Sequence, residues 1–226
     1  DAKMKMYNLD GSEGKMCGNG IRCVGKFLYD HGMVDINEKD EITIETLSGI
    51  KKLKAYTSGG KVNRLRVDMG KAILEPKAIP VVLDGAKVVD RPVEIAGKNY
   101  NITCVSMGNP HCVVFMDDID NLDIETVGPE FENDKLFPER VNTEFVTVLD
   151  DHTIKMRVWE RGSGETWACG TGACAVAVAA CENGFCKKGE DIKIKLKGGD
   201  LIINYTDETV YMTGNAEKVF EGEVEV

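Results

Sequence analysis

Hydrophobic and polar positions follow the same order in two distant parts of the chain. A helical pattern over Gly20–Asp30 and another over Gly172–Glu182 each follow a glycine-rich stretch. Each helix is followed by two runs of alternating hydrophobic and polar residues with glycine between them, "EITIETLSGIKKLKAY" (41–56) and "DIKIKLKGGDLIINY" (191–205). This alternation is typical of β-hairpins, so the pattern predicts two units of strand, loop, helix and hairpin.

The two units are an internal repeat. Laying the sequence that starts at Met4 over the sequence that starts at Met156 pairs Cys17 with Cys169, both within a Cys-Gly-x-Gly motif. Glycine also recurs at the end of each helix, where a C-terminal capping residue belongs. The second helix contains "ACAVAVAAC" and has almost no polar face, so we expect it to be buried on all sides.

The repeat also predicts how the chain is divided. Strand-like runs such as "RLRVDMG" and "VNTEFVTVL" precede the second unit and have no counterpart before the first. We therefore expect a first lobe of residues 1–63 with 215–226 and a second lobe of residues 64–214. We also expect a further N-terminal segment that carries the opening strands of the first lobe. The run "AEKVFEGEVEV" (216–226) is predicted to be a strand that returns to the first lobe.

Composition narrows the class of protein. The net charge is −10 and no run is rich in lysine or arginine, which disfavours a nucleic-acid or anionic-membrane partner. No apolar run approaches the length that spans a bilayer. The sequence therefore predicts a cytoplasmic enzyme that acts on a small molecule.

The chain is too long and too rich in hydrophobic sequence for its eight cysteines to imply a disulfide framework, and no histidine is spaced to complete a zinc site. We expect reduced thiols and no metal. Six of these residues are predicted to be small buried hydrophobic side chains: Cys23, Cys104, Cys112, Cys174, Cys181 and Cys186.

The remaining two cysteines, Cys17 and Cys169, precede the two helices. Unpaired N–H groups and the helix dipole at that position are expected to lower the pKa of the thiol and to bind a carboxylate beside it. Two such thiols, one on each side of a carboxylate-bound carbon, would allow a proton to leave one face and return to the other. This arrangement indicates a racemase or epimerase, and the absence of a full dinucleotide fingerprint or phosphate loop predicts no cofactor.

Four blocks of the sequence resemble signature motifs of the diaminopimelate epimerase family, in that family's order: "NLDGSEGKMCGNGIRC", "GNPHCVVF", "RVNTEFV" and "WERGSGETWACGTGACA". The resemblance implies an α+β fold of two pseudo-symmetric lobes, each a mostly antiparallel sheet wrapped around a central helix, with the active site between the lobes. It implies cofactor-independent interconversion of LL- and meso-diaminopimelate in lysine and peptidoglycan biosynthesis. It also implies a homodimer when the chain is full length.

The resemblance carries roles onto individual residues. Cys17 and Cys169 would be the acid/base thiols, with Glu160 and His111 tuning or orienting them. The residues that would bind the substrate are Asn8, Gly18, Asn19, Asn109, Asn142, Glu160, Arg161, Gly170 and Thr171. Arg161 suits a carboxylate because its planar fork binds two oxygens.

Alternatives of several classes stay open at this point. A proline or hydroxyproline racemase would use paired cysteines but needs no clamp such as Arg161, and isomerases of phenazine biosynthesis generally lack the pair. The chain could also be an inactive fragment of the epimerase. A cysteine hydrolase needs one thiol with a histidine base and leaves the second motif unexplained. A thiol-redox protein would join Cys17 and Cys169 in a disulfide.

Overall fold

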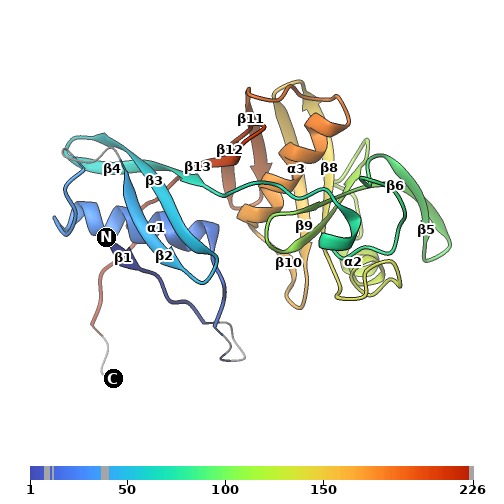
Figure 1. The fold of residues 1–226 in the computed structure, drawn as a ribbon, viewed down its shortest axis with the longest axis horizontal. Helices are drawn as coiled ribbons and strands as arrows, with labels where there is room; N and C mark the ends of the chain where they lie inside the picture. Colours follow the sequence, from blue (N-terminus) through green and yellow to red (C-terminus); the bar gives the residue numbers. More distant parts are fainter. Residues whose placement is uncertain (8–10, 12, 37–40, 224–226) are drawn as a thin grey trace. The chain divides into compact units, whose positions relative to one another are not determined.

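The chain folds into two units, shown in Figure 1. The structure is a computed structural model and describes residues 1–7, 11, 13–36 and 41–223. Unit 1 comprises Asp1–Val67 and Thr213–Val226, and unit 2 comprises Asp68–Met212. No helix in these described ranges is long and apolar enough to cross a membrane.

Unit 1 combines one helix with a small sheet. Its elements are β1 (Ala2–Lys3), α1 (Gly18–Asp30), β2 (Ile42–Thr46), β3 (Gly49–Ser58) and β4 (Lys61–Asp68), whose last residue begins unit 2. Strands β2 and β3 pair antiparallel and turn at Gly49, whose φ of +94° favours glycine. This pairing confirms the hairpin predicted over residues 41–56.

Helix α1 packs on this sheet through one face. Its buried residues include Ile21, Gly25 and Leu28, which recur at helical spacing. The approach is closest at Gly25, where an added Cβ would lie 2.6 Å from Leu65 Cδ2 and 2.9 Å from Leu53 Cδ2. Glycine at this position therefore lets the helix backbone lie directly on the side chains of β3 and β4.

Unit 2 holds most of the strands. Its elements are η1 (Pro76–Ala78), β5 (Arg91–Ile95), β6 (Lys98–Ser106), β7 (Pro110–Phe115), α2 (Ile124–Glu132), β8 (Asn142–Asp150), β9 (Thr153–Glu160), β10 (Gly164–Thr166), α3 (Gly170–Glu182), β11 (Asp191–Leu196) and β12 (Gly199–Tyr205). Strand β13 (Val210–Asn215) crosses the boundary into unit 1. The hydrogen-bonded order is β12–β11–β9–β8–β7–β6–β5, with β10 beside β9. Most pairs are antiparallel, and β7–β8 and β9–β11 are parallel.

The strands of unit 2 curve around α3. This helix contacts β6, β7, β8, β11 and β12, and every residue from Ala173 to Ala180 is buried. In Figure 1, α3 lies among these strands in the orange part of the chain. The burial confirms the prediction that this helix has no exposed face, and β11 and β12 form the second predicted hairpin. The fold is thus α+β, with sheet wrapped around a central helix.

Helix α2 was not predicted from the sequence. It is nine residues long and contains both Gly128 and Pro129, which weaken a helical pattern. Asp123 caps it by accepting a hydrogen bond from Thr126 N at 3.3 Å. Its Phe131 packs edge-on against Phe145 of β8, in a hydrophobic cluster between the helix and the sheet.

Two further predictions differ from the structure. The strand predicted from Ala216 is absent over residues 216–223, because side chains such as Val219 are exposed and find no strand partner in the described chain. Two of the six cysteines predicted to be buried are not. Cys23 is exposed on the solvent side of α1, and Cys181 is half-buried near the end of α3.

The close contact at Gly25 predicts the sign of the stability change when this glycine is replaced by alanine. Alanine at an exposed helical glycine stabilises a protein by about 1 kcal/mol. Because the Cβ at residue 25 meets two leucine side chains, we expect G25A to lower the free energy of unfolding by about 1–2 kcal/mol. Urea denaturation measures the change, with C23A on the exposed side of the same helix as a near-neutral control. A gain of stability in G25A would contradict the close packing.

Candidate active site

Two cysteines cap the two helices in the same way. Cys17 precedes α1 with φ −128° and ψ 116°, and Cys169 precedes α3 with φ −119° and ψ 110°. Each sulfur accepts a hydrogen bond from the backbone N–H three residues on, from Gly20 at 3.3 Å and from Gly172 at 3.4 Å. Both helices therefore begin two residues earlier than predicted, and each thiol is itself the capping group.

The surroundings of Cys169 oppose ionisation of its thiol. The residue is 5% exposed, and burial raises the pKa of the thiol well above its usual range. Glu160 and Glu144, when ionised, raise this pKa further, whereas the Thr171 hydroxyl and the Gly172 N–H lower it. The prediction that the helix start lowers this pKa is therefore wrong for Cys169, because desolvation outweighs the helix terminus.

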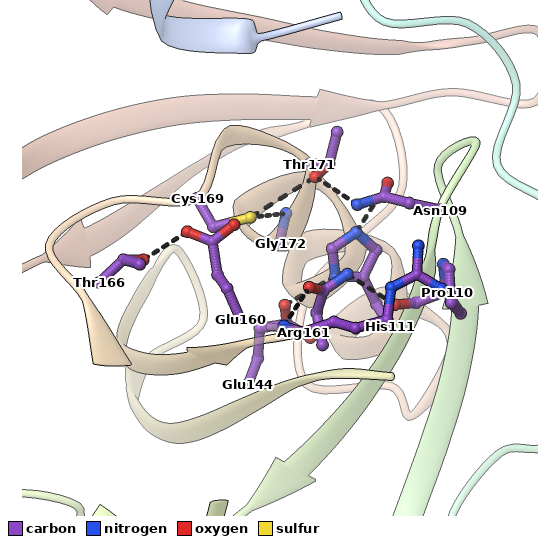
Figure 2. Close-up of polar contacts among 11 residues, drawn as sticks. Asn109, Pro110, His111, Glu144, Glu160, Arg161, Thr166, Cys169, Thr171 and Gly172 are labelled. Carbon is purple, nitrogen blue, oxygen red and sulfur yellow. Dashed lines mark hydrogen bonds and ion pairs between the residues drawn. The ribbon is translucent and has the colours of Figure 1, made fainter. Parts of the chain in front are cut away.

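A chain of hydrogen bonds leads from Cys169 into the core, as Figure 2 shows. Cys169 Sγ lies 3.5 Å from Thr171 Oγ1, and Asn109 Nδ2 donates to the same hydroxyl at 3.3 Å. Asn109 Oδ1 lies 3.1 Å from His111 Nε2, and His111 Nδ1 lies 2.7 Å from Glu144 Oε1. The structure thus brings four of the predicted residues together with one that was not predicted.

Glu144 is the functional residue that the sequence analysis missed. It lies in β8, in a run of five buried residues (142–146), and both it and His111 of β7 are 0% exposed. An acidic residue within a fully buried strand is rare unless it is paired, and this was the signal that could have found it. An added Cβ at Gly172 would lie 2.6 Å from Glu144 Oε1, so that glycine makes room for the carboxyl group.

Glu160 and Arg161 lie where β9 ends. Glu160 Oε1 accepts a hydrogen bond from the Thr166 hydroxyl, and Figure 2 shows the Glu160 carboxyl beside Cys169. Asn142 Oδ1 accepts from Arg161 N at 2.9 Å, while its Nδ2 donates to a backbone carbonyl of β7 at 2.9 Å. Asn142 therefore fixes the backbone at Arg161, whose guanidinium donates to the Glu139 carbonyl at 2.8 Å.

Glu132 of α2 fixes the same turn from the other side. This carboxylate is 6% exposed and accepts hydrogen bonds from Gly162 N at 2.9 Å and Trp159 Nε1 at 2.7 Å. Trp159 in turn packs on Gly128, where a Cβ would lie 2.3 Å from its ring. The turn that carries Arg161 is thus tied to α2, an element that the sequence analysis missed.

The first-turn residues of α1 form a separate group in unit 1. Arg22 donates to the Gly18 carbonyl at 3.0 Å and to Asn19 Oδ1 at 3.1 Å, so the first turn of α1 is fixed from within its own helix. Gly170 occupies the matching first position of α3 in unit 2. The remaining predicted residue, Asn8, lies outside the described residues.

Each helix start combines a thiol with backbone N–H groups that the helix leaves unpaired. Such an end binds a carboxylate, which places the carbon next to that carboxylate within reach of the sulfur. The chemistry available is therefore proton transfer at a carbon next to a carboxylate. Within the described part of the chain, no three His, Cys, Asp or Glu side chains gather as a metal site.

Solved structures of other proteins share this fold. The chain aligns with a probable proline racemase from Agrobacterium radiobacter K84 at TM-score 0.74 and 16% identity, over 99% of this chain and 72% of that one. It aligns with a phenazine biosynthesis protein of the PhzF family from Bacillus anthracis at TM-score 0.63 and 17% identity, over 99% and 80%. The fold is the one shared by these structures.

Sequence comparison gives the family. The chain matches the diaminopimelate epimerase family over residues 1–75 and 103–219. It is 53% identical to the diaminopimelate epimerase of Acetivibrio thermocellus over 228 residues, which is 100% of this chain and 80% of that protein. The epimerase of Methanococcus maripaludis strain C5 is 51% identical over the same shares. The chain belongs to the diaminopimelate epimerase family and is an isomerase. The racemase alternative is weaker, because its support is a fold shared at 16% identity.

The ties of Glu132 give a stability prediction. We expect E132A to lower the free energy of unfolding by about 1–2 kcal/mol, because the partly buried indole N–H of Trp159 and the backbone N–H of Gly162 lose a charged acceptor. The control is E130A, which removes an exposed carboxylate from the same helix and is expected to stay within about 0.5 kcal/mol of the wild type. Urea denaturation of both variants measures the difference between their free energies of unfolding. Equal values would show that Glu132 contributes no more than a surface residue.

The charge state of Cys169 gives a pH prediction. Because its pKa is raised, the thiol is protonated at neutral pH, and its alkylation rate should still be rising at about pH 10, where an ordinary thiol with a pKa of about 8.5 has levelled off. Iodoacetamide labelling followed by peptide mass spectrometry measures the rate at Cys169, with exposed Cys23 as the internal control. A rate at Cys169 that levels off below about pH 10, as expected of an ordinary thiol, would contradict the raised pKa.

Proposed function

We propose that this protein interconverts LL- and meso-diaminopimelate by moving the proton on one α-carbon between two thiols. The observation that carries the proposal is the repeated cap geometry, in which Cys17 and Cys169 occupy equivalent helix starts. The names of relatives that are more than half identical over the whole chain support the substrate. The reaction belongs to lysine and peptidoglycan biosynthesis.

The two helix starts are proposed to bind the carboxylate at the reacting carbon. The first N–H groups of a helix have no partner within it, and the helix dipole favours an anion there. Gly18 and Asn19 supply these groups in α1, and Gly170 and Thr171 supply them in α3. Positive potential on the carboxylate stabilises the carbanion that forms when the α-proton leaves, so no pyridoxal phosphate or metal is needed.

The proposed proton transfers begin with Cys169 as the protonated thiol. In the direction that starts with Cys169 as a thiol, the Cys17 thiolate takes the α-proton, and the electron pair of the C–H bond remains on the carbon as the carbanion. Cys169 then gives its proton to the opposite face of that carbon and becomes the thiolate. The reverse reaction starts from this state, with the two thiols exchanging roles. The raised pKa of Cys169 supports its role as the acid.

The distal end of diaminopimelate is proposed to lie against the polar set at the end of β9. Arg161 would bind the second carboxylate, with Asn109, Asn142 and Asn8 as hydrogen-bonding partners. Glu160 would tune the Cys169 thiol and accept a hydrogen bond from an ammonium group, and His111 would orient the site. A substrate with two carboxylates and two ammonium groups matches this combination of charges.

The lobe boundaries, the location, the oligomeric state and the partners of the protein are also part of the proposal. The two lobes would comprise residues 1–63 with 215–226 and residues 64–214. The protein would act in the cytoplasm as a homodimer without pyridoxal phosphate. A net charge of −10 and the lack of a basic run support the absence of nucleic-acid and membrane partners.

Hydrogen exchange tests the function directly. Reduced protein incubated with LL-diaminopimelate in D₂O should convert it to the meso form, with deuterium at one α-carbon of the product, because the new proton comes from a thiol that exchanges with solvent. NMR and mass spectrometry measure both changes. Absence of any conversion by reduced protein would overturn the proposed substrate.

Single substitutions test the two-thiol mechanism. C17A and C169A should each lower the epimerisation rate by at least about 100-fold, because either face then lacks its acid or base. C23A and C181A are matched controls, one on each helix, and should keep the wild-type rate. Near-normal turnover in C17A or C169A would show that a single base suffices.

A further inference from the structure

The pair formed by His111 and Glu144 is a buried acid/base unit that the proposed proton transfers do not use. Both side chains are 0% exposed, and His111 Nδ1 lies 2.7 Å from Glu144 Oε1. Neighbouring strands β7 and β8 hold them, and Gly172 at the start of α3 leaves room for the carboxyl group. The unit is therefore fixed on three sides, next to the helix start that carries Cys169.

The number of protons on this unit follows from its partners. Both nitrogens of the His111 ring face oxygen atoms, Nδ1 facing Glu144 Oε1 and Nε2 facing Asn109 Oδ1 at 3.1 Å. An amide oxygen only accepts, so Nε2 must carry a proton. A second proton must then lie between Nδ1 and Oε1, because two acceptors cannot share a hydrogen bond without one. Either the ring is an imidazolium beside a carboxylate, or Glu144 is a carboxylic acid that donates to Nδ1.

The second oxygen of Glu144 distinguishes these two forms. Glu144 Oε2 is buried and has no hydrogen-bond partner. An ionised carboxylate with one oxygen unpaired in the core is costly, whereas the carbonyl oxygen of a protonated acid loses much less. Among the charged groups around Glu144, His111 on β7 favours ionisation and Glu160 on β9 opposes it. Desolvation exceeds both effects and raises the pKa of the Glu144 carboxyl.

We propose that Glu144 is a positioning residue that stays protonated and donates its proton to His111 Nδ1, which holds the ring as the neutral Nε2–H tautomer. The hydroxyl of Glu144 is the donor, and Nδ1 contributes the accepting lone pair. His111 is then a donor toward the site and has no free lone pair with which to act as a base.

This tautomer sets the direction of the whole hydrogen-bond chain. His111 Nε2–H donates to Asn109 Oδ1, which turns Asn109 Nδ2 toward Thr171. Since the Thr171 hydroxyl accepts from that amide, its own proton is free to donate to Cys169 Sγ, 3.5 Å away. A donor to the sulfur stabilises the thiolate that the epimerisation requires. A neutral Glu144 also spares that thiolate a second negative neighbour beside Glu160.

The tautomer is read by NMR without any substrate, so this test is independent of the proposed function. In ¹⁵N-labelled wild type, we expect His111 to show a protonated Nε2 and an unprotonated, hydrogen-bonded Nδ1 at neutral pH. E144Q should show the same pattern, because the amide N–H of glutamine replaces the acid O–H as the donor to Nδ1. An imidazolium, or the Nδ1–H tautomer, in the wild type would overturn the proposal.

Kinetics test the consequence for catalysis, which rests on the proposed function. We expect E144Q to keep kcat within about threefold of the wild type, whereas E144L, which has no donor, should lose at least about tenfold in kcat with little change in KM. Circular dichroism confirms that both variants fold. If E144Q loses as much as E144L, the carboxylate charge rather than the donated proton matters and the proposal fails. If the wild type epimerises no diaminopimelate, the proposed function fails, and the NMR result still decides the state of Glu144.

Discussion

Burial of α3 on every side is the constraint on which the rest of unit 2 depends. A helix surrounded by strands along its whole length offers only its ends to a ligand, and the N-terminal end is the one with unpaired N–H groups. Cys169 stands at that end, so the sheet that buries the helix also positions the thiol. Small side chains from Ala173 to Ala180 allow the close packing, and Gly172 extends it to the carboxyl group of Glu144.

Burial also determines the electrostatics around the thiol. Burial raises the pKa of Cys169, and the Glu160 carboxylate beside it adds to the effect. The hydrogen-bond chain from Thr171 to Glu144 offsets the cost of ionising the buried thiol with directed hydrogen bonds rather than with a positive charge. The end of β9 is held by neutral and charged partners alike, with Asn142 and Glu132 fixing consecutive backbone N–H groups. Positioning in this site thus comes mainly from buried acceptors.

Periodicity and the internal repeat predict much of the fold. Both helices, both hairpins and the full burial of the second helix were predicted, because each follows from a local pattern that the fold does not override. The short helix α2 was missed because Gly128 and Pro129 hide its pattern, and with it the tie from Glu132 was missed. Glu144 was missed for a different reason, since its meaning depends on a neighbouring strand and a helix start that are distant in sequence. The thiol pKa was predicted in the wrong direction for Cys169, because a sequence shows the helix terminus but not the desolvation.

Close packing at α3 has a consequence for how this fold changes over evolutionary time. A helix lined by alanine and glycine has no spare volume, so almost any larger residue there costs stability before it alters chemistry. Changes in substrate specificity are therefore expected in the turns around the helix, such as the one that carries Arg161 and is tied to α2 by Glu132. The centre of unit 2 behaves as a fixed scaffold, and its turns are the part that selection can reshape.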